Sequence, residues 1–194
     1  RQMCIRDSFS DWEELFQAIS QNFTDGKSKK IVASRELEFL SQSPFELESI
    51  LQNLLENNPK AFIFAYQKEQ RIFLGASPEI LVQKNGNQLL SYALAGTFPK
   101  TMENAAEKLL TDPKNLLEHE IVVQKIKKNL LEKAESVKVG QTGLMELKNV
   151  YHLQTLLTAK SSKSSLIDWG KHLHPTPALG GEPRHEALLS LIHI

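Results

Sequence analysis

The stretch EILVQKNGNQLLSYAL, residues 79–94, decides the fold class of this chain. At its centre, Asn85-Gly86 separates two largely apolar runs, Glu79–Gln83 and Gln88–Leu94. The tightest hairpin turns need residues that accept a positive φ, and Asn-Gly is the pair that does so most readily. The stretch therefore predicts two neighbouring antiparallel strands joined by a short turn.

Strand and helix signals continue on both sides of this hairpin. Runs rich in β-branched and aromatic residues predict strands over Lys29–Phe39, Ala61–Gln67, Arg71–Gly75, Val137–Val139 and Asn149–Leu157. Helical spacing of apolar residues predicts helices over Phe9–Phe23, Phe45–Asn57, Glu103–Leu110, Pro113–Ala134 and Leu166–Leu173. Because several strands follow one another before the long helix, the order favours an α+β fold with antiparallel sheet layers and helices packed outside. A doubly wound parallel sheet would alternate strands with helices.

Composition limits the kinds of partner that the chain can have. It has 194 residues, 41% of them hydrophobic, which is enough to bury the core of one domain or of part of a larger one. The 23 basic and 23 acidic residues cancel, so no net charge attracts nucleic acid or an anionic membrane. No apolar run is long enough to span a bilayer, and no obligate protein partner is expected. The single cysteine, Cys4, excludes an internal disulfide framework, which predicts a reducing, cytoplasmic location.

The two ends of the chain fit the pattern between them poorly. Residues 1–8 carry no periodicity that joins them to the first helix, and residues 189–194 interrupt a helical run without a cap. We expect both to be non-native tails, with residues 9–188 forming the central part of one domain. The alternative is an ordinary frayed terminus at each end.

Lys30 is the first candidate for chemistry, at the start of the segment Lys30–Arg35. An amine at the start of a buried strand can lose its hydration, which lowers its pKa and allows it to act as a base. The alternative is a solvated strand end, because Lys29-Lys30 follows closely on Asp25-Gly26. From the residues alone, the solvated end is the more common case.

Glu79 is the second candidate, in the turn Gly75-Ala76-Ser77-Pro78-Glu79. Pro78 keeps Ser77 out of the helical region and fixes the bend. Glu79 then begins an apolar run, where a carboxyl group can have a raised pKa and act as a general acid. The alternative is an ordinary turn with a hydrated carboxylate.

Glu118 is the third candidate, in Glu118-His119-Glu120 on the predicted long helix. Helical spacing places it on the face of Val122 and Ile126, where a carboxylate needs a partner. That partner is either a hard cation such as Mg²⁺ or a neighbouring lysine or arginine. His119 reads most simply as a hydrogen-bonded core histidine, and Glu120 as a surface residue.

Two glycine-containing loops offer places where a ligand can approach the backbone. Ala95-Gly96-Thr97 is expected to close the hairpin and to offer backbone N–H groups and a hydroxyl to an anion. His174–Gly181, which reads HPTPALGG, is rigid at its start and permissive at its end, as the wall of a pocket would be. Both are also consistent with plain turn chemistry.

Taken together and in this order, these segments resemble the chorismate-utilising enzymes, a family of isochorismate, salicylate, anthranilate and aminodeoxychorismate synthases. The resemblance runs from about Lys29 to Ala187. Its blocks are Lys30–Arg35, Gly75–Glu79, Leu94–Thr97, Glu118–Val123, Asn149–Leu153 and Leu173–Gly181. One block alone is weak, whereas all of them in family order are specific. The resemblance implies a truncated anthranilate synthase component I-like fold, with residues 9–188 as the central part of a chorismate-binding catalytic domain.

Within the family, the residues resemble the isochorismate synthases most closely. Those enzymes carry a water-activating lysine where Lys30 stands, and Ala178 also resembles their type. Aminodeoxychorismate synthases place a nucleophilic lysine where this chain has Ala95. Salicylate synthases share the lysine of Lys30 and remain the closest alternative, followed by anthranilate-type lyases and by a non-catalytic relative that binds a small carboxylate. Lys100 departs from the arginine that is frequent in the family.

The resemblance implies a role for each candidate. Lys30 would take a proton from the water that attacks C2 of chorismate, and Glu79 would protonate the departing C4 hydroxyl. Glu118 would hold part of a Mg²⁺ ion that anchors the ring carboxylate, and the product would feed menaquinone or catecholate siderophore synthesis. The residues implied to line the chorismate site are Gly96, Thr97 and Ala178. The family's second acidic metal ligand follows the proline-rich loop and is absent here, so this chain alone is expected to be inactive.

Overall fold

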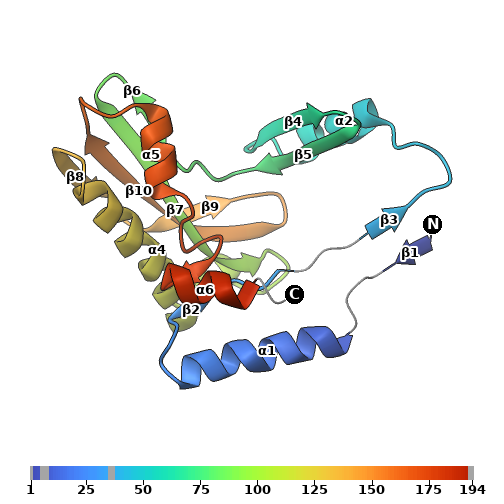
Figure 1. The fold of residues 1–194 in the computed structure, drawn as a ribbon, viewed down its shortest axis with the longest axis horizontal. Helices are drawn as coiled ribbons and strands as arrows, with labels where there is room; N and C mark the ends of the chain where they lie inside the picture. Colours follow the sequence, from blue (N-terminus) through green and yellow to red (C-terminus); the bar gives the residue numbers. More distant parts are fainter. Residues whose placement is uncertain (1, 5–8, 35–37, 192–194) are drawn as a thin grey trace. The chain divides into compact units, whose positions relative to one another are not determined.

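The computed structural model describes residues 2–4, 9–34 and 38–191. The chain forms two compact units, one from residues 1–45 together with 175–194, and one from residues 46–174 (Figure 1). The predicted α+β class with antiparallel strand pairing is confirmed in both units. Among the described residues, no helix is long and apolar enough to cross a membrane.

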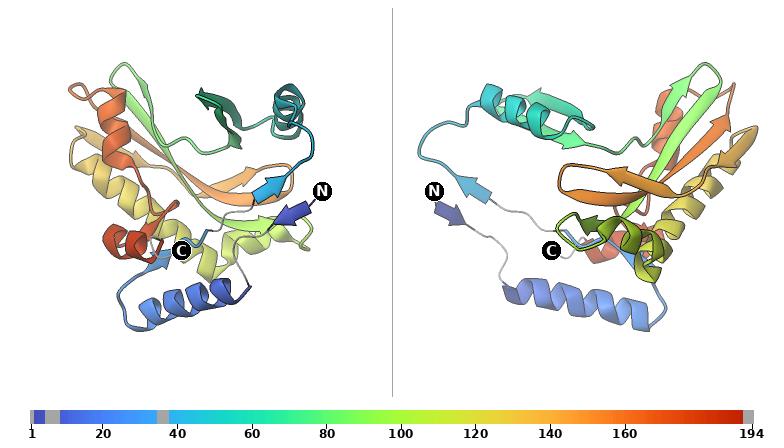
Figure 2. Two further views of the ribbon diagram at one scale, coloured as in Figure 1. Left: turned by 45° about the vertical axis from the view of Figure 1, so that its right-hand side comes forward. Right: turned by 180° about the vertical axis from the view of Figure 1, so that it is seen from behind.

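A five-stranded antiparallel sheet forms the centre of the second unit (Figures 1 and 2). The strand order is β6–β7–β10–β8. The edge of β10 that does not pair with β7 pairs with β8 along one half of its length and with β9 along the other half. The strands are β6 (Gln83–Asn85), β7 (Gln88–Pro99), β8 (Ser136–Val139), β9 (Gly143–Glu146) and β10 (Val150–Lys160).

Three helices accompany this sheet: α3 (Ala105–Thr111), α4 (Pro113–Leu131) and α5 (Leu166–Leu173). The long helix α4 packs against β7 and β10, and α5 packs against α4. Along β10, Leu153, Thr155 and Leu157 are buried, whereas the residues between them are only half-buried. This alternation is what a strand shows when helices cover one of its faces. The core consists mainly of Leu89, Ala93, Leu109, Val122, Ile126, Leu130, Leu153, Leu157 and Trp169.

Local sequence fixes where two of these helices begin. Asp112 caps α4, because its carboxylate accepts a 2.8 Å hydrogen bond from the Asn115 N–H and Pro113 occupies the first helical position. Ser165 and Asp168 form a capping box at the start of α5. The Asp112 cap fixes the first turn of α4, which contains Asn115.

A helix and a hairpin complete the second unit. Helix α2 (Leu47–Asn57) contacts both strands of the hairpin formed by β4 (Phe62–Lys68) and β5 (Arg71–Ser77). Alternate residues of β4 (Phe62, Phe64 and Tyr66) are aromatic and exposed, and the ring of Phe73 on β5 lies 5.3 Å from that of Phe64. The hairpin therefore carries an aromatic face.

The first unit contains short strand pairs and two helices. Strand β1 (Gln2–Cys4) pairs with β3 (Glu38–Leu40), and β2 (Lys30–Ile31) pairs with β11 (Gly181–Glu182). Helix α6 (Arg184–Leu191) contacts β2 and β11. Helix α1 (Phe9–Thr24) agrees with its predicted range to within one residue.

One predicted strand is divided into two in the structure. The strand predicted over Lys29–Phe39 is two short strands, because β2 ends at Ile31 and β3 begins at Glu38. Residues 35–37, including Arg35 of the predicted lysine segment, lie outside the described residues. The hydrogen bonds explain the early end of β2, because its partner β11 is itself only two residues long.

The hairpin that predicted the fold class exists, but its first strand is displaced. Strand β6 begins at Gln83, and residues 79–82 are irregular although Ile80 O still accepts a hydrogen bond from Tyr92 N. The pairing of Asn85 with Gln88 places Gly86, with φ +55°, at the first central position of the turn. The second central residue, Asn87, has no positive φ, which is typical of a II′ turn. The expected turn would have had Asn85-Gly86 as its two central residues, both with positive φ.

Candidate active site

Lys30 is buried, with 7% of its surface exposed. Its Nζ donates a 2.6 Å hydrogen bond to the carbonyl oxygen of Pro177. Ala178 is the next residue in the chain, and its N–H donates to the hydroxyl of the buried Thr176 at 3.3 Å. The structure therefore brings together two of the predicted site residues, Lys30 and Ala178, and Lys30 is not a solvated strand end.

Gly181 fixes the backbone around Lys30, although the sequence indicated only conformational freedom at this position. Gly181 lies opposite Ile31 in the pairing of β2 with β11, with φ +145°. A Cβ atom at Gly181 would lie 2.0 Å from the carbonyl oxygen of Lys30 and 2.8 Å from Cβ of Ala187. Only glycine allows this approach, so Gly181 helps to set the position of Lys30.

Glu79 follows the end of β5 in the second unit. It is half-buried, and its backbone N–H donates a 3.4 Å hydrogen bond to the hydroxyl of Ser77. The expectation that it opens a regular apolar strand was wrong, because residues 79–82 form no strand. The turn fixed by Pro78 therefore places Glu79 between β5 and β6, rather than on a sheet.

Gly96 is a bulge inside β7, and the expectation that it lies in a loop closing the hairpin was wrong. Thr97 pairs with His152 and Ala95 pairs with Leu153, which leaves Gly96 as the extra residue. Its φ is +80°, the left-handed value that glycine takes at such bulges. A Cβ atom there would lie 3.2 Å from Asn115 on α4 and 3.2 Å from Leu153. The bulge therefore lets α4 approach the strand closely.

Thr97 is engaged at both its hydroxyl and its backbone. The hydroxyl lies 2.7 Å from Nδ1 of His152, its cross-strand neighbour, and the backbone N–H donates to Oδ1 of Asn115 at 3.3 Å. The backbone N–H of Thr97, which was expected to be available to an anion, therefore donates to Asn115 instead. Burial lowers the pKa of His152, an effect that a hydrogen bond to the Gly96 backbone partly offsets.

Glu118 is half-buried on α4, in the same unit as Gly96 and Thr97. Its carboxylate forms an ion pair with Lys114, one helical turn earlier, with 2.7 Å between Oε2 and the lysine Nζ. A neighbouring lysine was one of the two partners expected from the sequence. Val122 and Ile126, on the same side of the helix, are fully buried.

The carboxylate of Glu118 could hold a magnesium ion only together with several other ligands. Mg²⁺ is usually held by one or two carboxylates and keeps water or substrate oxygens in its other positions. Within residues 2–4, 9–34 and 38–191, no group of three or more His, Cys, Asp or Glu side chains could hold a metal ion. Glu118 has the right donor chemistry, and the remaining ligands would have to come from water, substrate or further protein groups.

His119 is a buried core residue, as the sequence indicated. Its Nδ1 lies 3.1 Å from the Ala95 carbonyl, which can only accept, so Nδ1 carries the proton. Its Nε2 lies 2.7 Å from the Thr155 hydroxyl, which in turn lies 2.8 Å from the hydroxyl of Thr142. Burial lowers the pKa of His119 and keeps the ring neutral.

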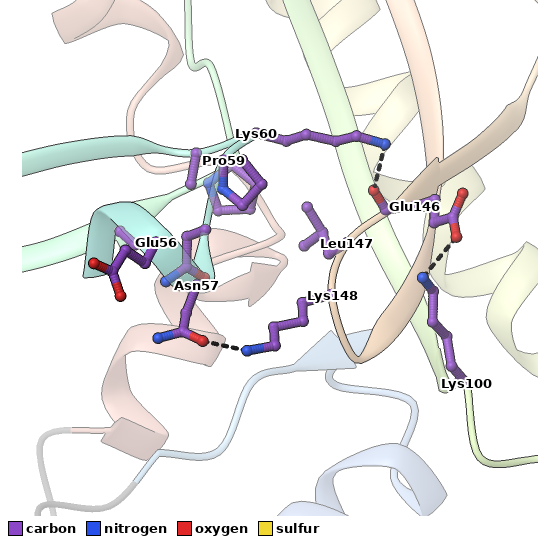
Figure 3. Close-up of a pocket in the computed structure, with 12 residues that line it drawn as sticks. Glu56, Asn57, Pro59, Lys60, Lys100, Glu146, Leu147 and Lys148 are labelled. Atoms are coloured by element: carbon purple, nitrogen blue, oxygen red, sulfur yellow. Dashed lines mark hydrogen bonds and ion pairs between the residues drawn. The ribbon is translucent and has the colours of Figure 1, made fainter. Parts of the chain in front are cut away.

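A cavity of about 400 Å³ lies elsewhere in the second unit (Figure 3). Glu146 is central to it, because its carboxylate pairs with Lys100 at 2.6 Å and its carbonyl accepts from Lys60 at 3.1 Å. Lys148 donates to the side-chain oxygen of Asn57 across the same space. The Nζ of Lys100 also lies 5.2 Å from the ring centroid of Tyr151, so the lysine that replaces the family's frequent arginine is doubly anchored.

This cavity is not the predicted site. The turn that precedes Glu79 contributes two of its walls, Ala76 and Pro78. The lining does not include Glu79, Gly96, Thr97 or Glu118. The predicted residues instead fall into two sets, Lys30 with Ala178 in the first unit and the remaining four in the second.

Comparison with known proteins decides the family. The model of the family described as chorismate binding enzyme matches residues 3–193, almost the whole chain. The chain belongs to the chorismate-binding enzymes. Its predicted membership, which depended on short blocks of sequence, is thereby confirmed.

Several relatives of this chorismate-binding chain are isochorismate synthases. It is 34% identical over 185 residues to isochorismate synthase MenF of Bacillus subtilis, covering 92% of this chain and 39% of the relative. It is 35% identical over 199 residues to the vibriobactin-specific isochorismate synthase of Vibrio cholerae, covering 96% and 50%. The chain thus spans half or less of the length of these curated relatives.

Solved structures confirm the predicted fold of this chorismate-binding chain. Anthranilate synthase component I from Streptococcus pneumoniae superposes with a TM-score of 0.87 at 19% identity, covering 99% of this chain and 44% of that one. The anthranilate synthase component I-like fold is therefore shown, over about half of the neighbour's length.

Proposed function

We propose that the protein to which this chain belongs is an isochorismate synthase, converting chorismate to isochorismate. The observation that carries the proposal is the buried amine of Lys30, held 2.6 Å from Pro177 O beside Ala178. The named isochorismate synthases at 34% and 35% identity support the same activity. The product would enter menaquinone or catecholate siderophore synthesis.

Lys30 would be the base. Burial favours the neutral form of an amine, and only that form can accept a proton from water. Its position is fixed by the short strand pair of β2 with β11 and by the close approach of Gly181. A base held in this way has one orientation toward a bound ring, which lowers the entropic cost of catalysis.

Glu79 would be the acid. Its half-buried position after Pro78 gives it less hydration than a surface carboxylate has, and a less hydrated carboxyl group keeps its proton more readily. A base and an acid of opposite protonation are what this reaction needs, because it adds one hydroxyl group and removes another.

The proposed step balances without an external reagent. Water forms a new C–O bond at C2 while its proton passes to Lys30. Both ring double bonds shift, the C4–O bond breaks, and the proton of Glu79 leaves with that oxygen as water. The proton gained by Lys30 returns to Glu79 through solvent and resets the pair. Substrate and product are isomers, so no oxidant or reductant is consumed.

Glu118 would contribute one carboxylate oxygen to a bound Mg²⁺, with Lys114 giving up its ion pair. The ion would supply positive charge that offsets the ring carboxylate of chorismate. Gly96, Thr97 and Ala178 would line the space around the ring.

Product analysis of the full-length protein tests the proposal. Incubation with chorismate and Mg²⁺ should yield isochorismate as the first product resolved by chromatography. Release of pyruvate without isochorismate would instead identify a salicylate or anthranilate-type lyase. Binding of chorismate without any conversion would identify a non-catalytic relative and reject the proposal.

A further inference from the structure

Asn115 lies on α4, the helix that carries Glu118, and its side chain contacts β7, the proposed substrate-lining strand. It is buried, with 5% of its surface exposed, in the first turn of α4. Its Oδ1 accepts the backbone N–H of Thr97 at 3.3 Å, and its Nδ2 donates to the carboxylate of Asp112 at 2.7 Å. Its Cβ and carbonyl oxygen define the space beside Gly96 that no side chain at that position could share.

We propose that Asn115 is a positioning residue that holds the backbone of Gly96 and Thr97 in a fixed place relative to Glu118. The inference depends on the proposed function, because it concerns the same substrate and metal groups. It adds a residue whose role neither the sequence nor the resemblance to the family indicated.

The first reason is the way α4 is attached to β7. Asn115 contacts Thr97, and His119, four residues later, contacts the carbonyl of Ala95 at 3.1 Å. Residues four apart lie one above the other on a helix, so two polar side chains join successive turns of α4 to both sides of the bulge. Glu118 is the residue before His119. A shift of Asn115 would therefore alter the distance between the bulge and Glu118.

The second reason is that a carboxamide suits both neighbours of Asn115. The Thr97 N–H donates and the Asp112 carboxylate accepts the hydrogen bonds that they make here, so the side chain between them needs one acceptor and one donor. An aspartate at 115 would keep the acceptor but place two carboxylates together. An alanine would lose both hydrogen bonds and leave a gap beside Gly96.

This geometry suggests a rescue experiment in the full-length protein. Asn115→Ala should weaken the binding of chorismate, and of Mg²⁺ in the presence of chorismate, by about tenfold, since both side-chain hydrogen bonds are lost and the Thr97 backbone is no longer held. Asn115→Asp should be impaired to a similar degree. The double variant D112N/N115D exchanges donor and acceptor, keeps a capping residue at 112, and should recover binding to within about twofold of the wild type.

Leu130→Ala is the matched control, because Leu130 is fully buried on the same helix near its far end. It should lower stability and leave both affinities unchanged. Binding is measured by equilibrium titration, and the amide resonance of Thr97 by nuclear magnetic resonance. That resonance should shift in Asn115→Ala and return in the double variant.

The outcomes separate this inference from the proposed function. If the wild type binds chorismate but forms no isochorismate, the proposed function fails, and the binding titrations still test Asn115. Unchanged affinities in Asn115→Ala would overturn the positioning role. The same holds if the double variant is as impaired as the single variants while its circular dichroism matches that of the wild type.

Discussion

The Nζ of Lys30 donates a hydrogen bond to the carbonyl oxygen of Pro177, a residue 147 positions away in the sequence. This contact joins the lysine strand to the proline-rich loop within the first unit. It also explains why a lysine beside Asp25-Gly26 is buried rather than solvated. The short pairing of β2 with β11 brings the two segments together.

Replacement of this lysine gives the most direct test of its role. In the full-length protein, Lys30→Ala should lower the rate of isochorismate formation by at least about a hundredfold, because a positioned general base contributes on the order of 10²–10⁴. Lys29→Ala is the matched control, since Lys29 is exposed and adjacent. Initial rates at saturating chorismate and Mg²⁺ measure the difference. Equal rates in the two variants would mean that Lys30 has only a structural role.

Replacement of Gly96 should disturb the bulge in β7. Gly96→Ala forces a side chain into a left-handed conformation at φ +80°, with contacts of 3.2 Å to Asn115 and Leu153. The expected cost is about 1–3 kcal/mol of unfolding free energy, together with weaker chorismate binding. Gly143→Ala, with no atom within 4 Å of the added Cβ and no positive φ, should change neither quantity by much. Denaturant titration and chorismate titration of the two variants provide the comparison.

Local signals predicted most helices, but not the details of the site. Helix α5 occupies the predicted range Leu166–Leu173, because the segment has helical apolar spacing and its capping residue, Ser165, comes directly before it. The bulge at Gly96 arises from the register of β7 against β10, which is set by residues far away in the sequence. The contact of Asn115 with Thr97 depends on the same register, so no local pattern could indicate it. Only its contact with Asp112 had a local signal, since Asp112-Pro113 marks a helix start and places residue 115 in its first turn.

Glu118 should matter for the metal more than its neighbour Glu120 does. Glu118→Gln removes a charged oxygen ligand and should weaken the apparent Mg²⁺ affinity of the full-length protein by about tenfold or more. Glu120→Gln is the control, because Glu120 is exposed and accepts its 2.6 Å hydrogen bond from Gln124. The activity is titrated with Mg²⁺ at fixed chorismate. If the two variants required the same Mg²⁺ concentration, Glu118 would be no more than the partner of Lys114.

Acid should destabilise the protein through His119 before most carboxylates titrate. Burial lowers the pKa of His119 in the folded state, so between that pKa and about 6.5 the unfolded chain binds a proton that the folded chain does not. The unfolding free energy should therefore fall as the pH falls through this window, by up to about 1.4 kcal/mol per pH unit for each such histidine. His152, whose pKa is also lowered, adds to the same slope. Denaturant unfolding of the full-length protein between pH 8 and about pH 5 measures it.

A pair of variants assigns the slope to His119. His119→Gln should be less stable than the wild type at pH 8, because it changes a buried ring hydrogen-bonded to Ala95 and Thr155, and it should show a shallower pH dependence. His185→Gln, whose side chain is 81% exposed, should keep the wild-type slope. If His119→Gln kept the full wild-type slope, the ring of His119 would titrate alike in the folded and unfolded states. The buried neutral ring bridging Ala95 and Thr155 would then be the wrong description of the contact between α4 and β7.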